Sequence, residues 1–400
     1  MSTRPYSHFF CWRSWSTHFP YIWLPWSMLL DKGCLPSKHK RAIVTPLLKK
    51  PDLDADELKN YWPVSNLKFM SKLVKRVVAS RLVSYLNDQD LMPQLQSAYQ
   101  RFFSTETAIL KVLLDIYCAI DSQHVVLLGL LDLSAALKCV DHDILLRRLR
   151  FRFGICGTVL DWIASFLFVR SQRVLYRGRL SSEWKLQFGV PPGSVLGPIL
   201  FLLYTAELFD VTAECGFTCH MYADNTRIYL STPASDHINV MERLAICIER
   251  IRGWMSDSHL KLNEEETQII WLGTRQQLNK LSTQALTCPN ATIQFSTAVK
   301  DLGVVLDSKL TPANHVAALS HSCFVYIQQL KSIKQSLTPE AMKTLVYAFI
   351  SSRSLLTSIS GQLLQRLQAI QNAATHLITG ARRFQHVTLM LRQLHWLPTW

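Results

Sequence analysis

Two aspartates stand next to short apolar segments, where carboxylates are well placed to bind a divalent cation. Asp224 lies in the polar tip of residues 221–229 (MYADNTRIY), whose flanks favour a tight strand–turn–strand hairpin. Asp132 follows residues 125–131, an apolar run with the length of a strand buried on both faces. Mg²⁺ prefers hard oxygen ligands on rigid elements. Two such metal ions, about 3.5–4 Å apart, catalyse phosphoryl transfer. Asp132 and Asp224 are therefore the candidate metal ligands.

The elements that would position this pair predict an α+β protein with a helical tail. Residues 172–190 are predicted to form a β-hairpin, because apolar and polar side chains alternate over residues 184–188. Residues 301–307 are predicted to form one further strand. An amphipathic helix is predicted around residues 72–86, with one apolar face and a basic face that carries Lys72, Lys75, Arg76 and Arg81. The other predicted strands and helices lie at about residues 42–48, 107–122, 144–149, 158–167, 199–208, 235–256, 269–273, 311–335, 339–357 and 362–379.

Composition narrows the possible partners. Lys and Arg exceed Asp and Glu by 14 in 400 residues, which suits nucleic acid or an anionic membrane surface, although a generically basic surface has the same charge. A hydrophobic fraction of 48% argues against disorder. No uncharged apolar run approaches the roughly 20 residues that span a bilayer. We therefore expect no membrane partner and an intracellular protein, in nucleus or cytoplasm.

The ten cysteines favour free thiols over a metal or disulfide framework. Cys215, Cys219 and His220 lie close together, but no second ligand pair follows at the spacing of a zinc site. The candidate metal site therefore consists of oxygen ligands.

In their order along the chain, these segments resemble the reverse transcriptase of LINE-type (non-LTR) retrotransposons. The resemblance covers about residues 39–398. Its motifs are residues 45–51 (TPLLKKP), 58–61 (LKNY), 131–136 (LDLSAA), 140–145 (VDHDIL), 193–198 (GSVLGP), 222–224 (YAD) and 394–398 (LHWLP).

This resemblance implies a right-hand polymerase fold. Its fingers would span residues 39–123, its palm 124–310 and a truncated helical thumb 311–400, with a short segment lost near residues 354–361. Residues 1–38 are an unassigned leader. The endonuclease domain and the zinc knuckles of the family are expected to be absent.

The family's activity is RNA-directed DNA synthesis with two Mg²⁺ ions, an RNA template, a DNA primer and deoxynucleoside triphosphates. The resemblance makes Asp132 and Asp224 its metal ligands, and it places Lys49 among the residues that contact the template or the nucleotide. The family also has a third catalytic carboxylate at position 225. Here the residue is Asn225, whose amide brings no charge, so we expect weaker metal binding and reduced turnover.

Four further departures fall in the same predicted pocket. Leu137 stands where the family has an aromatic side chain that excludes the ribose 2′-hydroxyl. Pro192 replaces the Gln before Gly193 in the turn expected to contact the template. Trp62 replaces an Arg expected to contact the incoming phosphates, and an aromatic ring lacks the guanidinium fork. Glu266 replaces a Lys that is the candidate acid for pyrophosphate, which reverses the charge.

Together these changes predict an impaired or inactive RNA-directed DNA polymerase. Two alternatives stay open. The first is a non-catalytic remnant of a retrotransposon polymerase that still binds RNA or DNA, and the second is a decayed copy that does not fold stably.

Overall fold

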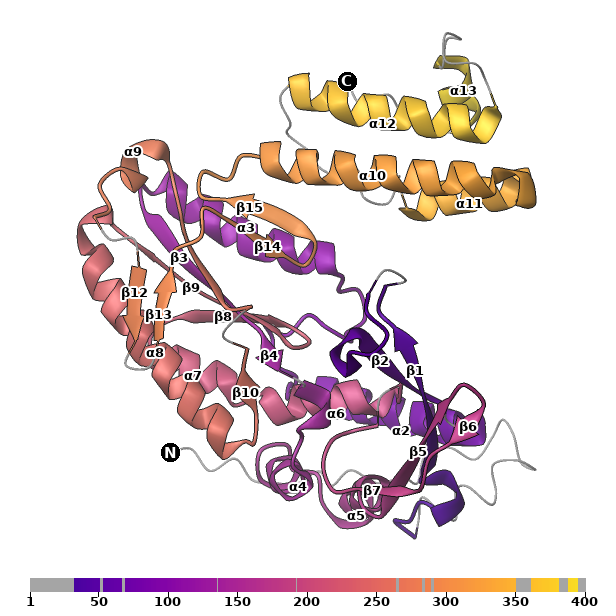
Figure 1. The fold of residues 1–400 in the computed structure, drawn as a ribbon. Coiled ribbons are helices and arrows are strands. Elements are labelled where there is room, and N and C mark those ends of the chain that lie inside the picture. The colour runs from indigo at the N-terminus through magenta and orange to yellow at the C-terminus, as the bar shows by residue number, and fades with distance from the viewer. Residues whose placement is uncertain are drawn as a thin grey trace. The chain divides into compact units, whose positions relative to one another are not determined.

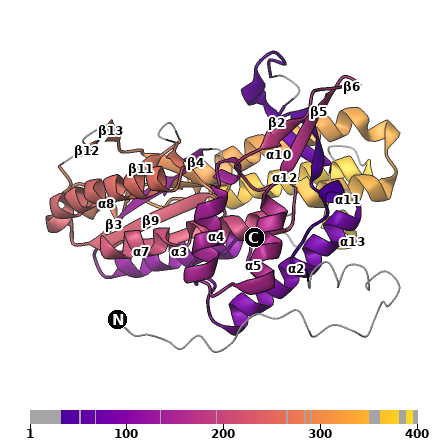
Figure 2. The same cartoon turned by 90° about the horizontal axis from the view of Figure 1, so that it is seen from below.

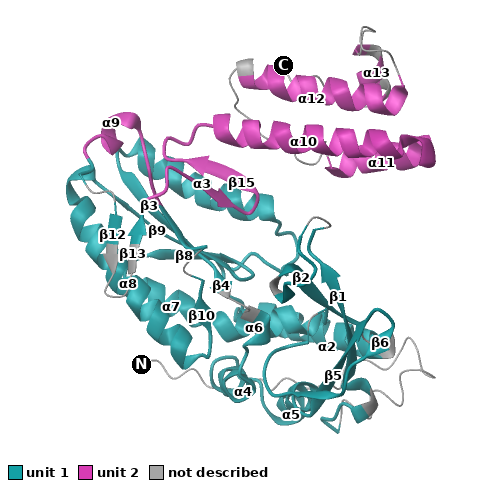
Figure 3. Cartoon of the chain, in the orientation of Figure 1, with its two compact units in different colours: residues 1–269, 281–294 teal, residues 270–280, 295–400 magenta. Residues whose placement is uncertain are grey.

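A computed structural model gives the fold of the chain, and it describes residues 32–50, 53–66, 69–134, 136–191, 193–263, 266–282, 285–288, 291–349, 361–380 and 388–394. The chain forms two compact units (Figure 3). Unit 1 comprises residues 1–269 and 281–294, and unit 2 comprises residues 270–280 and 295–400.

One sheet has the strand order β11-β3-β9-β8 and carries both candidate aspartates at strand ends. We call it the β3 sheet. Strands β3, β8 and β9 of this sheet are labelled in Figure 1. Its strands are β3 (Val125–Leu131), β8 (Thr218–Tyr222), β9 (Asn225–Thr232) and β11 (Gln268–Leu272). Most side chains of β3 are buried, as expected for a strand covered on both faces. Figure 2 shows helices α3 (Thr105–Asp121) and α8 (His237–Asp257) alongside this sheet, and both contact β3 or β9.

The β1 sheet is the other large sheet of unit 1, with the order β2-β1-β5-β6 and β7 paired to β5. The parallel pair β1–β5 joins residues from the start of the chain to residues about 130 positions later, with Arg41 opposite Ser171. The strands are β1 (Arg41–Leu48), β2 (Tyr61–Asn66), β5 (Arg170–Tyr176), β6 (Arg179–Leu180) and β7 (Trp184–Leu186). The predicted hairpin at residues 172–190 is thus realised by β5, β6 and β7.

The remaining elements of unit 1 are helices and short pairings. The helices are α2 (Phe69–Asp88), α4 (His142–Phe151), α5 (Gly157–Leu167), α6 (Leu196–Thr205) and α7 (Leu208–Glu214). The 3-10 turns are η1 (Ser37–His39), η2 (Leu58–Asn60), η3 (Ala136–Lys138) and η4 (Ala234–Asp236). The strand pairs are β4 (Leu133–Ser134) with β10 (Lys261–Leu262), and β12 (Ala285–Cys288) with β13 (Ala291–Gln294).

Residues 196–214, which form α6 and α7, are the one described helical stretch long and apolar enough to cross a membrane by length and composition. The helix predicted over residues 199–208 forms as α6, which begins at Leu196 and ends at Thr205, and the separate helix α7 begins at Leu208. Of the most apolar part of this stretch, 67% is buried inside the fold, as expected for a helix in the core of a protein.

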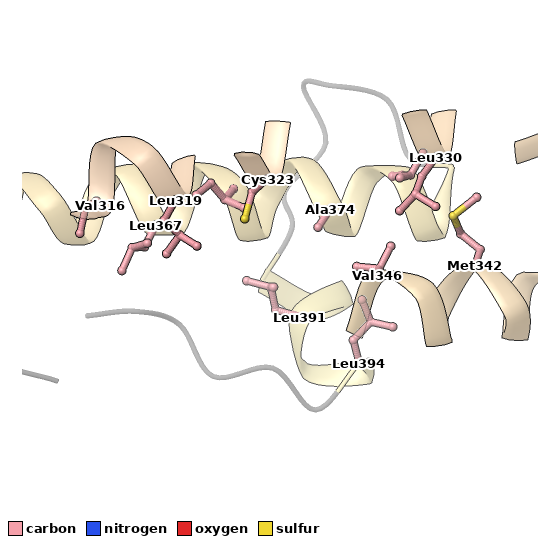
Figure 4. Close-up of a cluster of buried hydrophobic side chains, with 12 residues drawn as sticks. Val316, Leu319, Cys323, Leu330, Met342, Val346, Leu367, Ala374, Leu391 and Leu394 are labelled. Atoms are coloured by element: carbon pink, nitrogen blue, oxygen red, sulfur yellow. The ribbon is translucent and has the colours of Figure 1, made fainter. Parts of the chain in front are cut away.

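Unit 2 is built on helices that share one apolar core. Figure 4 shows this core, in which Val346 and Leu367 are 0% and 3% exposed. The predicted capping of α11 is confirmed, because the amide of Ala341 donates to Thr338 Oγ1 at 3.2 Å. The elements are α9 (Arg275–Leu278), β14 (Ala298–Asp301), β15 (Val304–Asp307), α10 (Ala313–Ile333), η5 (Lys334–Ser336), α11 (Pro339–Phe349), α12 (Gly361–Thr379) and α13 (Thr388–Gln393).

Two sequence predictions about these elements were wrong. Residues 301–307 do not form one strand, because Leu302 and Gly303 both have positive φ angles (43° and 92°) and make the turn of a β14–β15 hairpin. Lys75 is not on an exposed basic face of α2; it is 1% exposed, and the Phe166 ring of α5 lies 5.2 Å from its Nζ. The predicted lost segment near residues 354–361 lies largely outside the described residues.

Candidate active site

The hairpin predicted around Asp224 forms as β8 and β9. Tyr222 pairs with Asn225, so Ala223 and Asp224 are the two residues of the turn. Ala223 has φ +57°, in the left-handed region that favours glycine, so this turn is held in a conformation with some strain. Asp224 is half-buried at the tip, and Asn225 is exposed at the start of β9.

Asp132 reaches the same tip from the neighbouring strand. The antiparallel register of β3 and β9 pairs Leu131 with Thr226, so the next residue, Asp132, lies level with the turn. Burial raises the pKa of Asp224, and the nearby charge of Asp132 raises it further. The two predicted carboxylates are therefore close enough to repel each other.

Asn263 orients Asp132, and the sequence analysis missed this role. The side-chain amide of Asn263 donates to Asp132 Oδ2 at 3.2 Å, and its backbone amide donates to the Asp132 carbonyl at 2.9 Å. The pairing of β10 with β4, in which Leu262 lies opposite Leu133, brings Asn263 to this position. Nothing local distinguishes an asparagine after a two-residue strand, so only the pairing identifies it.

Glu266 also lies beside Asp132. The Asp132 carboxylate, by its charge and by a hydrogen bond, raises the pKa of Glu266, while the cation of Lys49 opposes that rise. Lys49 follows the end of β1, so the β1 sheet contributes a cation close to the acidic group. Glu266, which replaces the Lys expected to act as an acid for pyrophosphate, thus adds a negative charge near the predicted metal ligands.

The other predicted site residues lie on separate elements. Trp62 is 64% exposed on β2, where it pairs with Leu47. Leu137 lies in η3, and its carbonyl accepts a hydrogen bond from the amide of Val190 at 2.9 Å. Gly193 has φ +73° in the turn before α6, a conformation that favours glycine. Pro192 lies outside the described residues.

A second missed residue near Asp224 is Tyr99. Burial raises the pKa of its phenol, and the charges of Asp224 and Tyr222 raise it further. Tyr99 is half-exposed and belongs to residues 93–100, which carry no motif and no regular element. The site therefore draws on a segment far from the hairpin in sequence.

The donor chemistry of the site fits Mg²⁺. Asp132 and Asp224 provide hard oxygen ligands, and a bound divalent cation would relieve the repulsion that raises the pKa of Asp224. In the part of the chain that the structure describes, no group of three His, Cys, Asp or Glu side chains converges closely enough to hold a metal ion. Two carboxylates would thus hold the ion, with amide or water oxygens completing its ligands.

These features are those of the right-hand polymerase fold. The fold agrees with the solved structure of apo telomerase from Candida tropicalis, with a TM-score of 0.51 over 89% of this chain and 59% of that chain at 10% identity. The predicted right-hand fold is thereby confirmed.

The chain belongs to the reverse transcriptase (RNA-dependent DNA polymerase) family, whose sequence profile matches residues 48–306. Over 394 residues it is 27% identical to the probable RNA-directed DNA polymerase from transposon BS of Drosophila melanogaster, covering 94% of this chain and 42% of that protein. The corresponding protein from transposon X-element of the same species is 26% identical, with 94% and 41% covered. The predicted relationship to non-LTR retrotransposon enzymes is confirmed, and the chain spans about two-fifths of the length of these relatives.

Proposed function

We propose that this chain carries the polymerase site of a LINE-type RNA-directed DNA polymerase, and that its turnover is impaired because Asn225 replaces a third carboxylate. The observation that supports the proposal is the meeting of Asp132 and Asp224 at one sheet end, with the uncharged Asn225 exposed beside them. The proposed substrates are an RNA template, a DNA primer and deoxynucleoside triphosphates.

The residues of the site would divide the work as follows. When bound, Mg²⁺ lowers the pKa of the primer 3′-hydroxyl and stabilises charge on the departing pyrophosphate. Asp132 and Asp224 would hold the ions, and Asn263 keeps the Asp132 carboxylate in one orientation. The cation of Lys49, whose charge acts on Glu266, would attract a phosphate group bound at this site. Glu266 supplies no cation for pyrophosphate, which would further reduce turnover.

Primer extension on an RNA template with Mg²⁺ tests this proposal. We expect the unaltered chain to extend near background, and Asn225→Asp to raise the rate at least about a hundredfold, the effect of roughly 3 kcal/mol of regained metal-site stabilisation. Asp132→Ala in the Asn225→Asp background is the control and should abolish extension. Rapid extension by the unaltered chain, unimproved by Asn225→Asp, would show that the two carboxylates suffice and that the proposed impairment is wrong.

A second candidate function is nucleic-acid binding without synthesis, and the outer face of the β1 sheet favours it. Leu47 pairs with Trp62 and Thr45 with Val64, so these side chains share one face, on which Trp62 and Leu47 are 64% and 52% exposed. Exposed aromatic rings stack on unpaired bases, and the chain's net charge of +14 attracts the phosphate backbone. Salt-sensitive binding of an RNA–DNA hybrid without extension, even after Asn225→Asp, would support this function.

A further inference from the structure

Residues 95–98 run along β8, the strand at the end of the β3 sheet that leads into the Asp224 turn. The amide of Met221 donates to the Leu95 carbonyl at 2.9 Å, and the amide of Ser97 donates to the Met221 carbonyl at 2.9 Å. The segment therefore pairs with β8 at Met221, next to the Asp224 turn. It meets the sheet close to the candidate metal site.

The side chain of Gln96 extends from this segment to the turn itself. It is 1% exposed, and its Oε1 accepts hydrogen bonds from the amides of Ala98 at 3.0 Å and Ala223 at 3.2 Å. Its Nε2 donates to the Ala223 carbonyl at 3.5 Å. One buried side chain thus binds both polar backbone groups of Ala223.

Ala223 is the residue of the turn that most needs external support. Its φ of +57° disfavours any residue with a β-carbon, so the isolated turn would relax toward other conformations. The Ala223 carbonyl belongs to the peptide that enters Asp224, and its orientation determines where the Asp224 side chain points. Hydrogen bonds to both groups of Ala223 therefore restrict the direction of the carboxylate.

We propose that Gln96 is a positioning residue that fixes the Asp224 turn, and thereby the separation of Asp224 from Asp132. This inference rests on the proposed function, because its consequence is metal binding by that pair. If Gln96 only stabilised the fold, its replacement would lower the stability of the whole unit. If Gln96 positions the turn, its replacement changes the Ala223 turn and metal binding in particular.

Amide hydrogen exchange at Ala223 tests the contact directly. In the unaltered full-length chain we expect the Ala223 amide to be protected like that of Met221. Gln96→Met, which keeps the side-chain length but removes the amide, should speed exchange at Ala223 about tenfold, the loss of roughly one hydrogen bond. The amides of β9 paired with β3 should not change.

The control is Ile163→Val in α5, a change at a fully buried residue outside this segment. It should leave exchange at Ala223 unaltered. If the Ala223 amide of the unaltered chain exchanges as fast as the amides of an exposed loop, the inference is overturned. This result needs no variant, so the test still holds if Gln96→Met does not fold.

Mn²⁺ binding, followed by electron paramagnetic resonance of Mn²⁺ alone, tests the consequence. Gln96→Met should weaken Mn²⁺ binding about three- to tenfold, the range expected for one lost hydrogen bond, while Ile163→Val should not change it. Faster exchange at Ala223 with unchanged Mn²⁺ affinity would overturn the positioning role. Absence of Mn²⁺ binding by the unaltered chain would instead contradict the proposed function, and the exchange result would then decide the contact at the turn.

Discussion

At the scale of single residues, the site combines retained and altered charges in one place. Asp132 and Asp224 repel each other, Glu266 adds a further carboxylate beside Asp132, and Asn225 adds no charge. Asn263 stabilises one orientation of Asp132 through its amide. The acidic character of the site is therefore preserved, although its distribution differs from the pattern that the family implies.

Trp62 permits a residue-scale prediction about nucleic-acid binding. Because the ring is 64% exposed, Trp62→Ala removes a stacking surface with little loss of packing. We expect affinity for single-stranded RNA to fall at least about fivefold, since stacking one base contributes about 1–3 kcal/mol. Fluorescence anisotropy with a labelled oligonucleotide measures this, and Phe151→Ala, an exposed aromatic at the end of α4, is the matched control. An equal loss in both variants would show that Trp62 is not a specific contact.

At the scale of elements, α2 and β5 each bury a basic side chain that has no acidic partner among the described residues. Lys75 and Arg170 are each 1% exposed, and both lie 5.2 Å from the Phe166 ring. In the described part of the chain, Lys75 Nζ and the Arg170 atoms Nε and Nη2 have no hydrogen-bond partner. Burial, with the charges of Arg170 and Lys72, lowers the pKa of Lys75 to about 7. This contact between helix and sheet is therefore a weak point of unit 1.

Lys75→Met should accordingly stabilise the protein. At pH 7 we expect the free energy of unfolding to rise by about 2 kcal/mol, because an unpaired buried cation is replaced by an apolar chain of similar length. Below pH 7 Lys75 is charged in both states, and its burial cost is complete. Between pH 7 and 10 it is neutral in the fold but charged when unfolded, so the stability of the unaltered chain rises with pH.

Urea unfolding at pH 7 and pH 9 measures both effects. The gap between Lys75→Met and the unaltered chain should narrow as the pH rises. Arg76→Met, at an exposed residue of the same helix whose charge does not act on Lys75, is the control and should change stability little. A destabilising Lys75→Met would contradict the assignment of Lys75 as an unpaired cation.

At the scale of the whole molecule, the chain divides into two compact units, and each has its own buried apolar residues. The candidate site belongs to unit 1, whereas the apolar cluster of α10, α11, α12 and α13 belongs to unit 2 (Figure 4). A loss of packing in that cluster should therefore leave the site intact.

Leu367→Ala in α12 tests this division. Leu367 is 3% exposed, and truncating a buried leucine destabilises by about 2–5 kcal/mol through lost burial and the cavity that remains. Hydrogen exchange should accelerate in peptides from α10, α11 and α12 and stay unchanged in β8 and β9. Arg366→Ala, at the exposed neighbouring residue, is the control. Accelerated exchange in the hairpin as well would show that the two units unfold together.

The amino-acid sequence by itself determined the local features of this protein. The apolar run of β3 predicted a buried strand that ends at Asp132, and the hairpin around Asp224 followed from its polar tip. The start of α11 followed from Thr338 and Pro339. These features depend on neighbouring residues, whose spacing is visible in the chain, and the family motifs supplied the rest of the predicted site.

Only the tertiary structure decided which distant residues meet. Gln96 contacts Ala223 across 127 positions, and Asn263 contacts Asp132 across 131 positions. Lys75 is buried with its Nζ 5.2 Å from the Phe166 ring of α5, a contact that helical periodicity cannot predict. Strand pairing and helix packing are interactions between surfaces far apart in sequence. A local pattern therefore identifies the two aspartates, but not the amide side chains that contact Asp132 and the Asp224 turn.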